Sequence, residues 1–189
     1  MAFNVNQIVT SINKDGVLKP SKFEVVFTKN TNLPAVDLVE LGKIRCIAAM
    51  IPGMTINTTD FRLHGGMPAL RVPVSRTHND LRLTFLTTKD SKDRYQFEIW
   101  MRSIQNFSTN TMSYYDDISS NILINVYDEN DQLFGYSVNV MRAIPLSIDD
   151  VDLSWADTDK LMEYSVTFSY EQLQIQNDPL NDLLSPTMN

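Results

Sequence analysis

The sequence has few of the residues on which catalysis, metal binding and secretion depend. Its 189 residues include one cysteine, Cys46, two histidines, His64 and His78, and six glycines. A single cysteine excludes a disulfide within the chain and is typical of folding in a reducing cytoplasm. No run approaches the roughly 18 apolar residues of a membrane span. The first residues lack the basic and apolar regions of a signal peptide, so we expect neither a span nor a signal peptide.

Catalytic sequence motifs are missing as well. There is no Gly-x-Ser-x-Gly, no glycine-rich phosphate loop and no His-Glu-x-x-His. The stretch Asp128–Asp131 resembles the start of a calcium loop, but Leu133 stands where that loop needs glycine. Neither histidine has a cysteine or carboxylate at metal-ligand spacing. We therefore predict that the protein is not an enzyme and holds no metal or cofactor.

Positive charge is scarce in the second half of the chain. Residues 1–95 contain 13 Lys and Arg against 8 Asp and Glu, a balance of +5, whereas residues 96–189 contain 3 against 15, a balance of −12. The two balances sum to the net charge of −7. An acidic half argues against tight binding of DNA phosphates, which needs clustered cations. It is compatible with a surface that repels DNA.

One helix is the clearest periodic feature that the chain does have. Between Ser91 and Phe107, four large apolar residues recur at i, i+3, i+4 and i+7 and share one stripe: Phe97, Trp100, Met101 and Ile104. The opposite face carries four polar side chains: Lys92, Glu98, Arg102 and Gln105. Two aromatic rings on one stripe need a broad apolar surface opposite, so we expect this helix to lie on β-sheets.

Nearly all other periodic segments indicate strands. They cover residues 22–28, 44–51, 55–63, 69–74, 80–86, 121–127, 133–142, 151–155 and 163–170. We expect the strand 44–51 to be buried and Ile144-Pro145 to break the sheet. The predicted fold class is mainly β with α, a β-sandwich or barrel flanked by one amphipathic helix. The predicted core anchors are Phe97, Trp100, Met101, Ile104, Trp155 and Phe168.

The chain is long enough for one sizeable domain, and we take residues 1–189 as a single domain. Residues 1–20 are expected to form an N-terminal arm with a short amphipathic helix, because Val5, Ile8, Val9 and Ile12 recur at helical spacing. Residues 54–74 are expected to form a projecting hairpin around Gly65-Gly66, and residues 172–189 a loosely ordered C-terminal tail.

The order of several short segments resembles a known family. An N-terminal helical stretch leads through Val17–Val25 into a strand, an apolar strand ends in Ile51-Pro52-Gly53, and a long hairpin follows. Next come Leu81–Phe85, the Tyr95-x-Phe97-x-x-Trp100 helix, Ala143-Ile144-Pro145, Val151–Trp155 and Tyr164–Phe168. Together these segments resemble the major tail tube protein of contractile-tailed (myovirus) bacteriophages over roughly residues 5–171.

The resemblance implies a structural protein of the virion, assembled in the cytoplasm of the host bacterium. Six copies would form a ring, and rings would stack head to tail into a hollow tube. A contractile sheath would enclose the tube, which would house the tape-measure protein and conduct DNA without binding it specifically. Further implied partners are the sheath, baseplate and tail terminator proteins.

Three sets of residues are candidates for these contacts. The subunit and ring interface is assigned to Ile8, Ile12, Leu63, His64, Gly65, Gly66 and Met67. Acidic residues expected to line the lumen are Asp128, Glu129, Asp131, Asp149, Asp150 and Asp152. The polar helix face, Lys92, Glu98, Arg102 and Gln105, is assigned to the sheath.

Two alternatives stay open at this point. A baseplate or tube-initiator subunit, or the tube protein of a related contractile injection system, would share the fold. A monomeric β-sandwich binding module would instead need a concave aromatic or charged site, which the sequence does not reveal.

Overall fold

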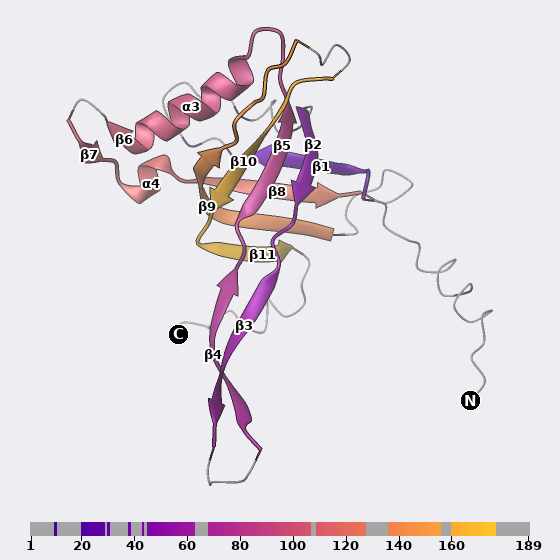
Figure 1. Cartoon of the computed structure of the whole chain (residues 1–189), viewed down its shortest axis with the longest axis vertical. Coiled ribbons are helices and arrows are strands. Elements are labelled where there is room, and N and C mark those ends of the chain that lie inside the picture. Colours follow the sequence, from indigo (N-terminus) through magenta and orange to yellow (C-terminus); the bar gives the residue numbers. More distant parts are fainter. Residues whose placement is uncertain are drawn as a thin grey trace, which may run out of the picture.

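The computed structural model describes residues 10, 20–28, 30, 38, 43, 45–62, 68–106, 109–127, 136–155 and 160–176. These residues form two antiparallel sheets that share one strand, a separate long hairpin, and a helix packed against the sheets (Figure 1). The predicted fold class, mainly β with a flanking helix, is confirmed.

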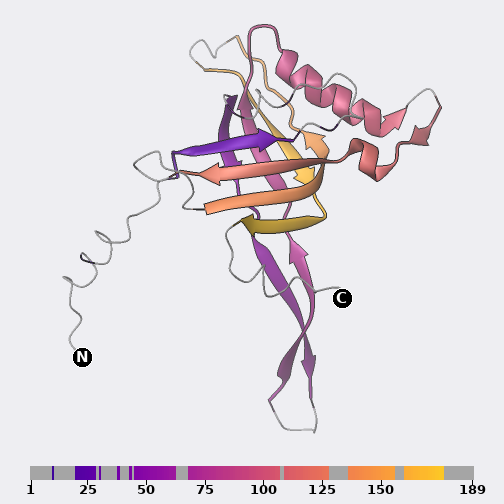
Figure 2. The same cartoon turned by 180° about the vertical axis from the view of Figure 1, so that it is seen from behind.

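We call the first sheet sheet A. It consists of β1 (Phe23–Phe27), β8 (Ser120–Val126), the first half of β9 (Tyr136–Ile148) and β11 (Gln172–Gln176). Sheet B consists of the second half of β9, β10 (Glu163–Ser169), β5 (Leu81–Leu86) and β2 (Cys46–Met50). The strands of the two sheets cross at a steep angle, which both views show (Figures 1 and 2).

The remaining elements lie outside these sheets. The long hairpin is β3 (Met54–Phe61) with β4 (Leu70–His78), and the helix is α3 (Lys92–Ile104). A small hairpin of β6 (Gln105–Asn106) and β7 (Thr111–Met112) follows α3 and leads into the short helix α4 (Tyr115–Ile118).

Strand β9 passes from sheet A into sheet B by a bend at Arg142. This residue has φ of 53°, a left-handed conformation that a residue with a Cβ rarely adopts. Its N–H donates to Asn121 Oδ1 (2.9 Å), and its carbonyl accepts from the Tyr115 hydroxyl (2.7 Å). Its guanidinium pairs with Asp116 and Glu171. These contacts from β8, α4 and the residue before β11 hold the bend in place.

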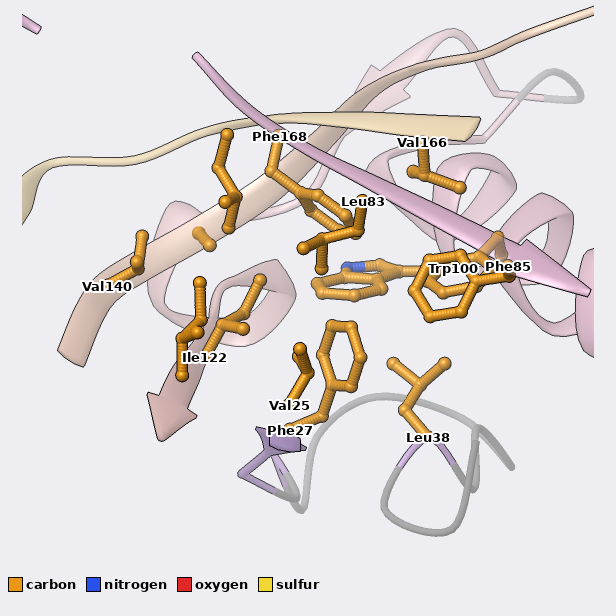
Figure 3. Packing of buried hydrophobic residues seen from close by; sticks show 14 of the residues in the cluster. Val25, Phe27, Leu38, Leu83, Phe85, Trp100, Ile122, Val140, Val166 and Phe168 are labelled. Carbon is orange, nitrogen blue, oxygen red and sulfur yellow. The ribbon is translucent and has the colours of Figure 1, made fainter. Parts of the chain in front are cut away.

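The core lies between the crossed sheets and is closed by α3. Phe97 and Trp100 are fully buried and meet rings from three strands. The Phe97 ring lies 5.2 Å from Phe85 and 6.1 Å from Phe27, and Trp100 lies 5.9 Å from Phe168, measured between centroids. Figure 3 shows Trp100 with rings and aliphatic side chains of β1, β5, β8, β9 and β10 around it. Aromatic rings at these distances add to the apolar area that is buried.

Two buried polar side chains of α3, Trp100 and Asp93, are hydrogen-bonded or ion-paired. The Trp100 indole Nε1–H donates to the Ile118 carbonyl at 2.7 Å, which ties α3 to α4. Asp93, in the first turn, is buried and pairs with Arg45, and it accepts from the Thr88 hydroxyl at 3.0 Å. A buried carboxylate needs such partners, because removal from water penalises its charged form.

Strand β2 differs from the sequence-based expectation. The apolar run 44–51 was expected to form a buried strand, but β2 is the edge strand of sheet B, and Ile47 and Met50 are exposed. An apolar run in one sequence cannot distinguish a central strand from an edge strand that a second molecule covers. The core anchors Phe97, Trp100 and Phe168 are fully buried, whereas Met101 and Ile104 are half-buried.

Two further predictions near the end of β9 are wrong. Ile144-Pro145 does not break the sheet, because β9 continues to Ile148 and Pro145 is buried opposite Phe168. Proline is tolerated there since this half of β9 is an edge of sheet B, where one side needs no N–H donor. Residues 151–155 form no strand, and Trp155 is fully exposed rather than a core anchor. The segment lies beyond the last β9–β10 bond, Asp149 N to Ser165 O, and has no strand to pair with.

Some predicted segments lie outside the described residues. They include the N-terminal helix apart from Thr10, and the C-terminal tail beyond Gln176. Gln172–Gln176, assigned to the tail from sequence, forms β11 and pairs with β9. Within the described ranges, no helix combines the length and the apolar character that a membrane span requires.

We predict that Phe97→Ala lowers the free energy of unfolding by about 3–5 kcal/mol, since a fully buried ring is removed from a closed core. Equilibrium denaturant unfolding of the monomer measures the change. The control is Tyr114→Ala, because Tyr114 is 84% exposed and its removal should change stability by less than about 0.5 kcal/mol. Equal effects of the two substitutions would contradict the assignment of α3 as the closure of the core.

Candidate functional site

Among the described residues, the largest element without a packed face is the β3–β4 hairpin. Every described residue of β3 is exposed, as is every residue of β4 except His78. Both views show the hairpin extending from one end of sheet B, away from the rest of the described chain (Figures 1 and 2). A two-stranded ribbon with no packed face is marginally stable in water. Its exposed strands therefore suggest a surface that another molecule covers.

The hairpin carries apolar and basic side chains together. Phe61 pairs with Leu70 and Thr59 with Val72, so Phe61, Leu70 and Val72 share one face. Phe61 and Leu70 are 54% and 60% exposed, too much for two large apolar side chains that only pack within the hairpin. The hairpin contains three arginines, Arg62, Arg71 and Arg76, and one carboxylate, Asp60, so its charge balance is +2.

A second apolar surface lies at the opposite end of sheet B. The loop from β9 to β10 exposes Leu153, Trp155 and Leu161 almost completely. Residues 150–154 and 160–163 line a pocket of about 490 Å³. Asp150 and Asp152 are exposed beside it, whereas Asp149 pairs with Arg82 and is held closer to the sheet.

Sheet B ends in two edges without a further partner strand among the described residues. One edge is β2 and the other is the second half of β9. The outward face of sheet B carries small hydroxyl side chains beside Arg82, and the Thr84 and Ser165 hydroxyls lie 2.9 Å apart. Thr167 pairs with Ser147 on one side and Arg82 on the other. This face carries mostly small polar side chains, and its Arg82 pairs with Asp149.

A groove of about 680 Å³ runs between the second half of α3 and β9. Its apolar lining comes from Met101, Ile104, Met112, Ile144, Pro145 and Leu146, and its polar lining from Glu98, Arg102 and Gln105. Glu98 is shared by Arg94 (3.4 Å) and Arg102 (3.8 Å), so these three side chains together carry a balance of +1. The groove is an exposed, mostly apolar surface with a polar rim.

The described residues contain no group of three or more His, Cys, Asp or Glu side chains that could hold a metal ion. Cys46 lies on β2, where burial raises the pKa of its thiol to about 12, and its Sγ lies 3.4 Å from the Ala48 carbonyl. A thiol with that pKa stays protonated near neutral pH and is a poor nucleophile. The distinctive surfaces of the described residues are the exposed apolar and charged surfaces given above.

Comparison with known families and structures identifies the fold. The sequence matches the family model described as phage tail tube protein over residues 18–176. The chain belongs to the phage tail tube protein family. Its members are structural proteins rather than enzymes. A comparison with curated proteins finds no match.

Solved structures of similar fold come from contractile injection systems. A chain from the sheath-tube complex of the PVC extracellular contractile injection system, in its extended state, matches with a TM-score of 0.64 at 15% identity, covering 93% of this chain and 99% of that one. A chain from the baseplate of the anti-feeding prophage matches with 0.64 at 16%, covering 84% and 95%. A chain from the tube-terminating cap of the same prophage matches with 0.61 at 18%, covering 85% and 91%. At these identities the matches establish a shared fold.

Only some of the contact residues predicted for this tail tube protein are placed by the structure. Ile8, Ile12, Leu63, His64, Gly65, Gly66 and Met67 lie outside the described residues, as do Asp128, Glu129 and Asp131. The described strands of the hairpin lead directly to residues 63–67. Lys92, Glu98 and Arg102 lie on the solvent side of α3, and Gln105 begins β6 directly after the helix; Glu98, Arg102 and Gln105 line the groove.

Sequence reasoning missed two exposed apolar groups of this tail tube protein. These are Phe61, Leu70 and Val72 on the hairpin, and Leu153, Trp155 and Leu161 in the β9–β10 loop. Large apolar residues in one sequence are assigned to the core by default, which is how Trp155 was misplaced. Only the three-dimensional fold shows that no part of the described chain covers them.

Proposed function

We propose that this chain is the structural subunit of a phage tail tube, in which rings of six copies stack head to tail around a channel. The observation that carries the proposal is a tail tube fold whose β3–β4 hairpin is exposed and whose sheet B has two edges without a partner strand among the described residues. Surfaces of this kind are costly in a monomer and favour association, because apolar side chains leave water when copies meet.

Ring formation would use the two free edges of sheet B. The edges β2 and second-half β9 differ from each other, so contact between copies would be heterologous, as closure of a ring requires. Backbone N–H and C=O groups of an edge strand are available to a neighbour's strand. Pairing of β2 of one copy with β9 of the next would join six copies of sheet B into one continuous wall.

The outward face of sheet B would then line the channel. Its hydroxyl side chains, Thr84, Ser147, Ser165 and Thr167, offer no cluster of cations to hold phosphate. Asp149 reaches this face and pairs with Arg82, the one exposed cation of β5. Because of this ion pair, Arg82 would not be free to bind a DNA phosphate. Passing DNA would meet a neutral to acidic surface. The tape-measure protein would occupy the same channel before ejection.

The exposed side of α3 would face the sheath. The helix closes the core rather than joining the wall of sheet B, so Lys92, Glu98, Arg102 and Gln105 are available to another protein. The groove beside them offers apolar area with a polar rim, the usual composition of a protein contact. The assembled tube would end at terminator and baseplate proteins in the virion tail.

A second candidate is a subunit that starts the tube at a baseplate. It is favoured by the similarity to a chain of the anti-feeding prophage baseplate, with the same TM-score of 0.64 as the sheath-tube complex. The other alternative with the same fold is the tube protein of a related contractile injection system. The length of the assembly that the purified protein forms distinguishes the two roles, because an initiator would stop at one ring whereas a tube subunit would continue to stack.

Electron microscopy of the purified protein tests the proposal. We expect stacked rings with six-fold symmetry that grow into long hollow tubes. The double variant Phe61→Ser/Leu70→Ser should fold as the wild type does, because both side chains are exposed, yet form far fewer tubes. Isolated monomers of the wild type at high concentration would rule out the tube role, and single rings that never stack would favour the initiator.

The channel assignment has its own test. Ser147→Lys/Thr167→Lys places two new cations per copy on the outward face of sheet B, and we expect tubes to form normally while DNA ejection from virions slows. The matched control, Thr109→Lys/Thr111→Lys, adds two cations at exposed positions of the β6–β7 hairpin, away from sheet B, where ejection should keep the wild-type rate. If the sheet variant ejects DNA at the wild-type rate, the assignment of sheet B to the channel wall is wrong.

A further inference from the structure

We propose that the groove between α3 and β9 receives the C-terminal segment, residues 177–189, of the neighbouring copy in a ring. This α3–β9 groove is the one whose apolar lining comes from α3, Met112 and residues 144–146. Residues 177–189 lie outside the described residues and beyond the family match, which ends at residue 176. The proposal rests on the proposed function, because it needs copies side by side in a ring.

The α3–β9 groove is an apolar surface that no other described part of the chain covers. Met112 and Leu146 are 73% and 49% exposed, and Met101 and Ile104 are only half-buried. These side chains border a space of about 680 Å³. Apolar surface gathered in a groove with a polar rim is typical of a site that binds an apolar segment of a protein.

The C-terminal segment has the sequence pattern of such an occupant. Leu180, Leu183 and Leu184 recur at i, i+3 and i+4, so they would share one face of a short helix. Asp178-Pro179 is a typical helix start, with aspartate as N-cap and proline in the first turn, and Ser185-Pro186 is a typical end. So short a helix is marginal alone in water. A groove that takes up the leucine face would stabilise it, which is a common mode of peptide recognition.

The register of β11 indicates that the segment does not fill the groove of its own copy. Strand β11 runs antiparallel to β9 and ends with Gln176 opposite Ser137, at the end away from the bend at Arg142. The stretch of β9 from Ser137 to Arg142 spans about 17 Å, and the groove lies beyond the bend. Residues 177–180 span at most about 14 Å. The first leucine therefore stops short of the groove in its own copy.

The same register places the end of β11 on the side of the molecule that carries β2. Glu24, Asn125, Ser137 and Gln176 lie in one row across sheet A. Lys43, shortly before β2, pairs with Glu24 at the end of this row (3.2 Å). Both views show β11 ending on the β2 side, and α3 with the second half of β9 on the other side (Figures 1 and 2).

Pairing of β2 of one copy with β9 of the next would bring the segment and the groove to the same interface. The segment leaves the first copy on its β2 side, and the groove of the second copy opens beside its β9 edge. The neighbour in the ring is therefore the copy whose segment can reach the groove. The docked leucines would add buried apolar area to the strand pairing that closes the ring.

The charges of the segment and of the groove rim are of opposite sign. Residues 177–189 contain Asp178 and Asp182 and no Lys or Arg, a balance of −2. Glu98, Arg94 and Arg102 at the rim together carry a balance of +1. Opposite signs favour the approach of the segment to this surface. The groove lies along the second half of α3, so a docked segment would leave Lys92 at the start of the helix available to the sheath.

A disulfide between copies tests the docking. In full-length protein with Cys46→Ala, which removes the native thiol, we introduce Leu183→Cys on the segment and Met112→Cys on the groove. Oxidised tubes, run on a denaturing gel without reductant, should give a ladder of covalent species up to six copies. The matched control, Asn181→Cys with Met112→Cys, places the thiol on the polar face of the segment, and we expect at least about tenfold less linked protein.

The apolar contact is tested by Leu183→Ser/Leu184→Ser. We expect the critical concentration for tube formation to rise at least about tenfold, because two apolar anchors are lost. The unfolding midpoint of the monomer should not change, since the contact exists only between copies. The matched control, Asn181→Ala/Thr187→Ala, alters polar positions of the same segment and should keep the wild-type critical concentration. Sedimentation of tubes over a series of protein concentrations gives these values.

The outcomes separate this inference from the proposed function. If the wild type forms tubes but the cysteine variant gives no covalent species between copies, the groove has another occupant, such as the sheath, and the inference is wrong while the tube role stands. A disulfide within one copy, or a wild-type critical concentration for Leu183→Ser/Leu184→Ser, also overturns it. If the wild type forms neither rings nor tubes, the proposed function is wrong and the inference falls with it.

Discussion

The insertion of Phe97 and Trp100 between two crossed sheets is the contact on which the rest of this structure depends. Sheets that cross at a steep angle leave one side of their core open, and α3 fills that side with two large rings. The indole N–H of Trp100 also holds the carbonyl of Ile118 and so fixes α4 against the helix. Among the described residues, α3 packs on the core side, and no helix lies over the outward face of sheet B.

Strand β9 is the second constraint, because it belongs to both sheets. The bend at Arg142 sets the angle between them, and its ion pairs with Asp116 and Glu171 stabilise a backbone conformation that is unfavourable for arginine. Once this angle is fixed, β5 and β2 run straight on into the hairpin at one end of sheet B, and the β9–β10 loop lies at the other. The chain thus places unlike surfaces at the two ends of one sheet, which is the geometry that a polar stack of identical subunits needs.

The parts of the fold that the sequence predicts are those whose packing is internal. The helix stripe around Phe97 and Trp100, and the alternation in β5 and β10, correctly predicted buried faces because those side chains pack against the same chain. The errors concern apolar residues at edges and in loops, Ile47, Met50 and Trp155. Periodicity reports that a side chain is apolar but not whether the surface that covers it belongs to the same molecule. The same limit kept the apolar face of the hairpin, Phe61 and Leu70, out of the predicted contacts.

The tube role therefore depends on one contact, in which another copy of the chain covers the β3–β4 hairpin. Amide hydrogen exchange, measured on the monomer and on assembled tubes, tests it most directly. An exposed two-stranded ribbon should exchange quickly in the monomer, while the amides of β5 and β10 are protected in both states. We expect the amides of β3 and β4 to become strongly protected in the tube. Fast exchange of the hairpin in assembled tubes, equal to that in the monomer, would contradict the account.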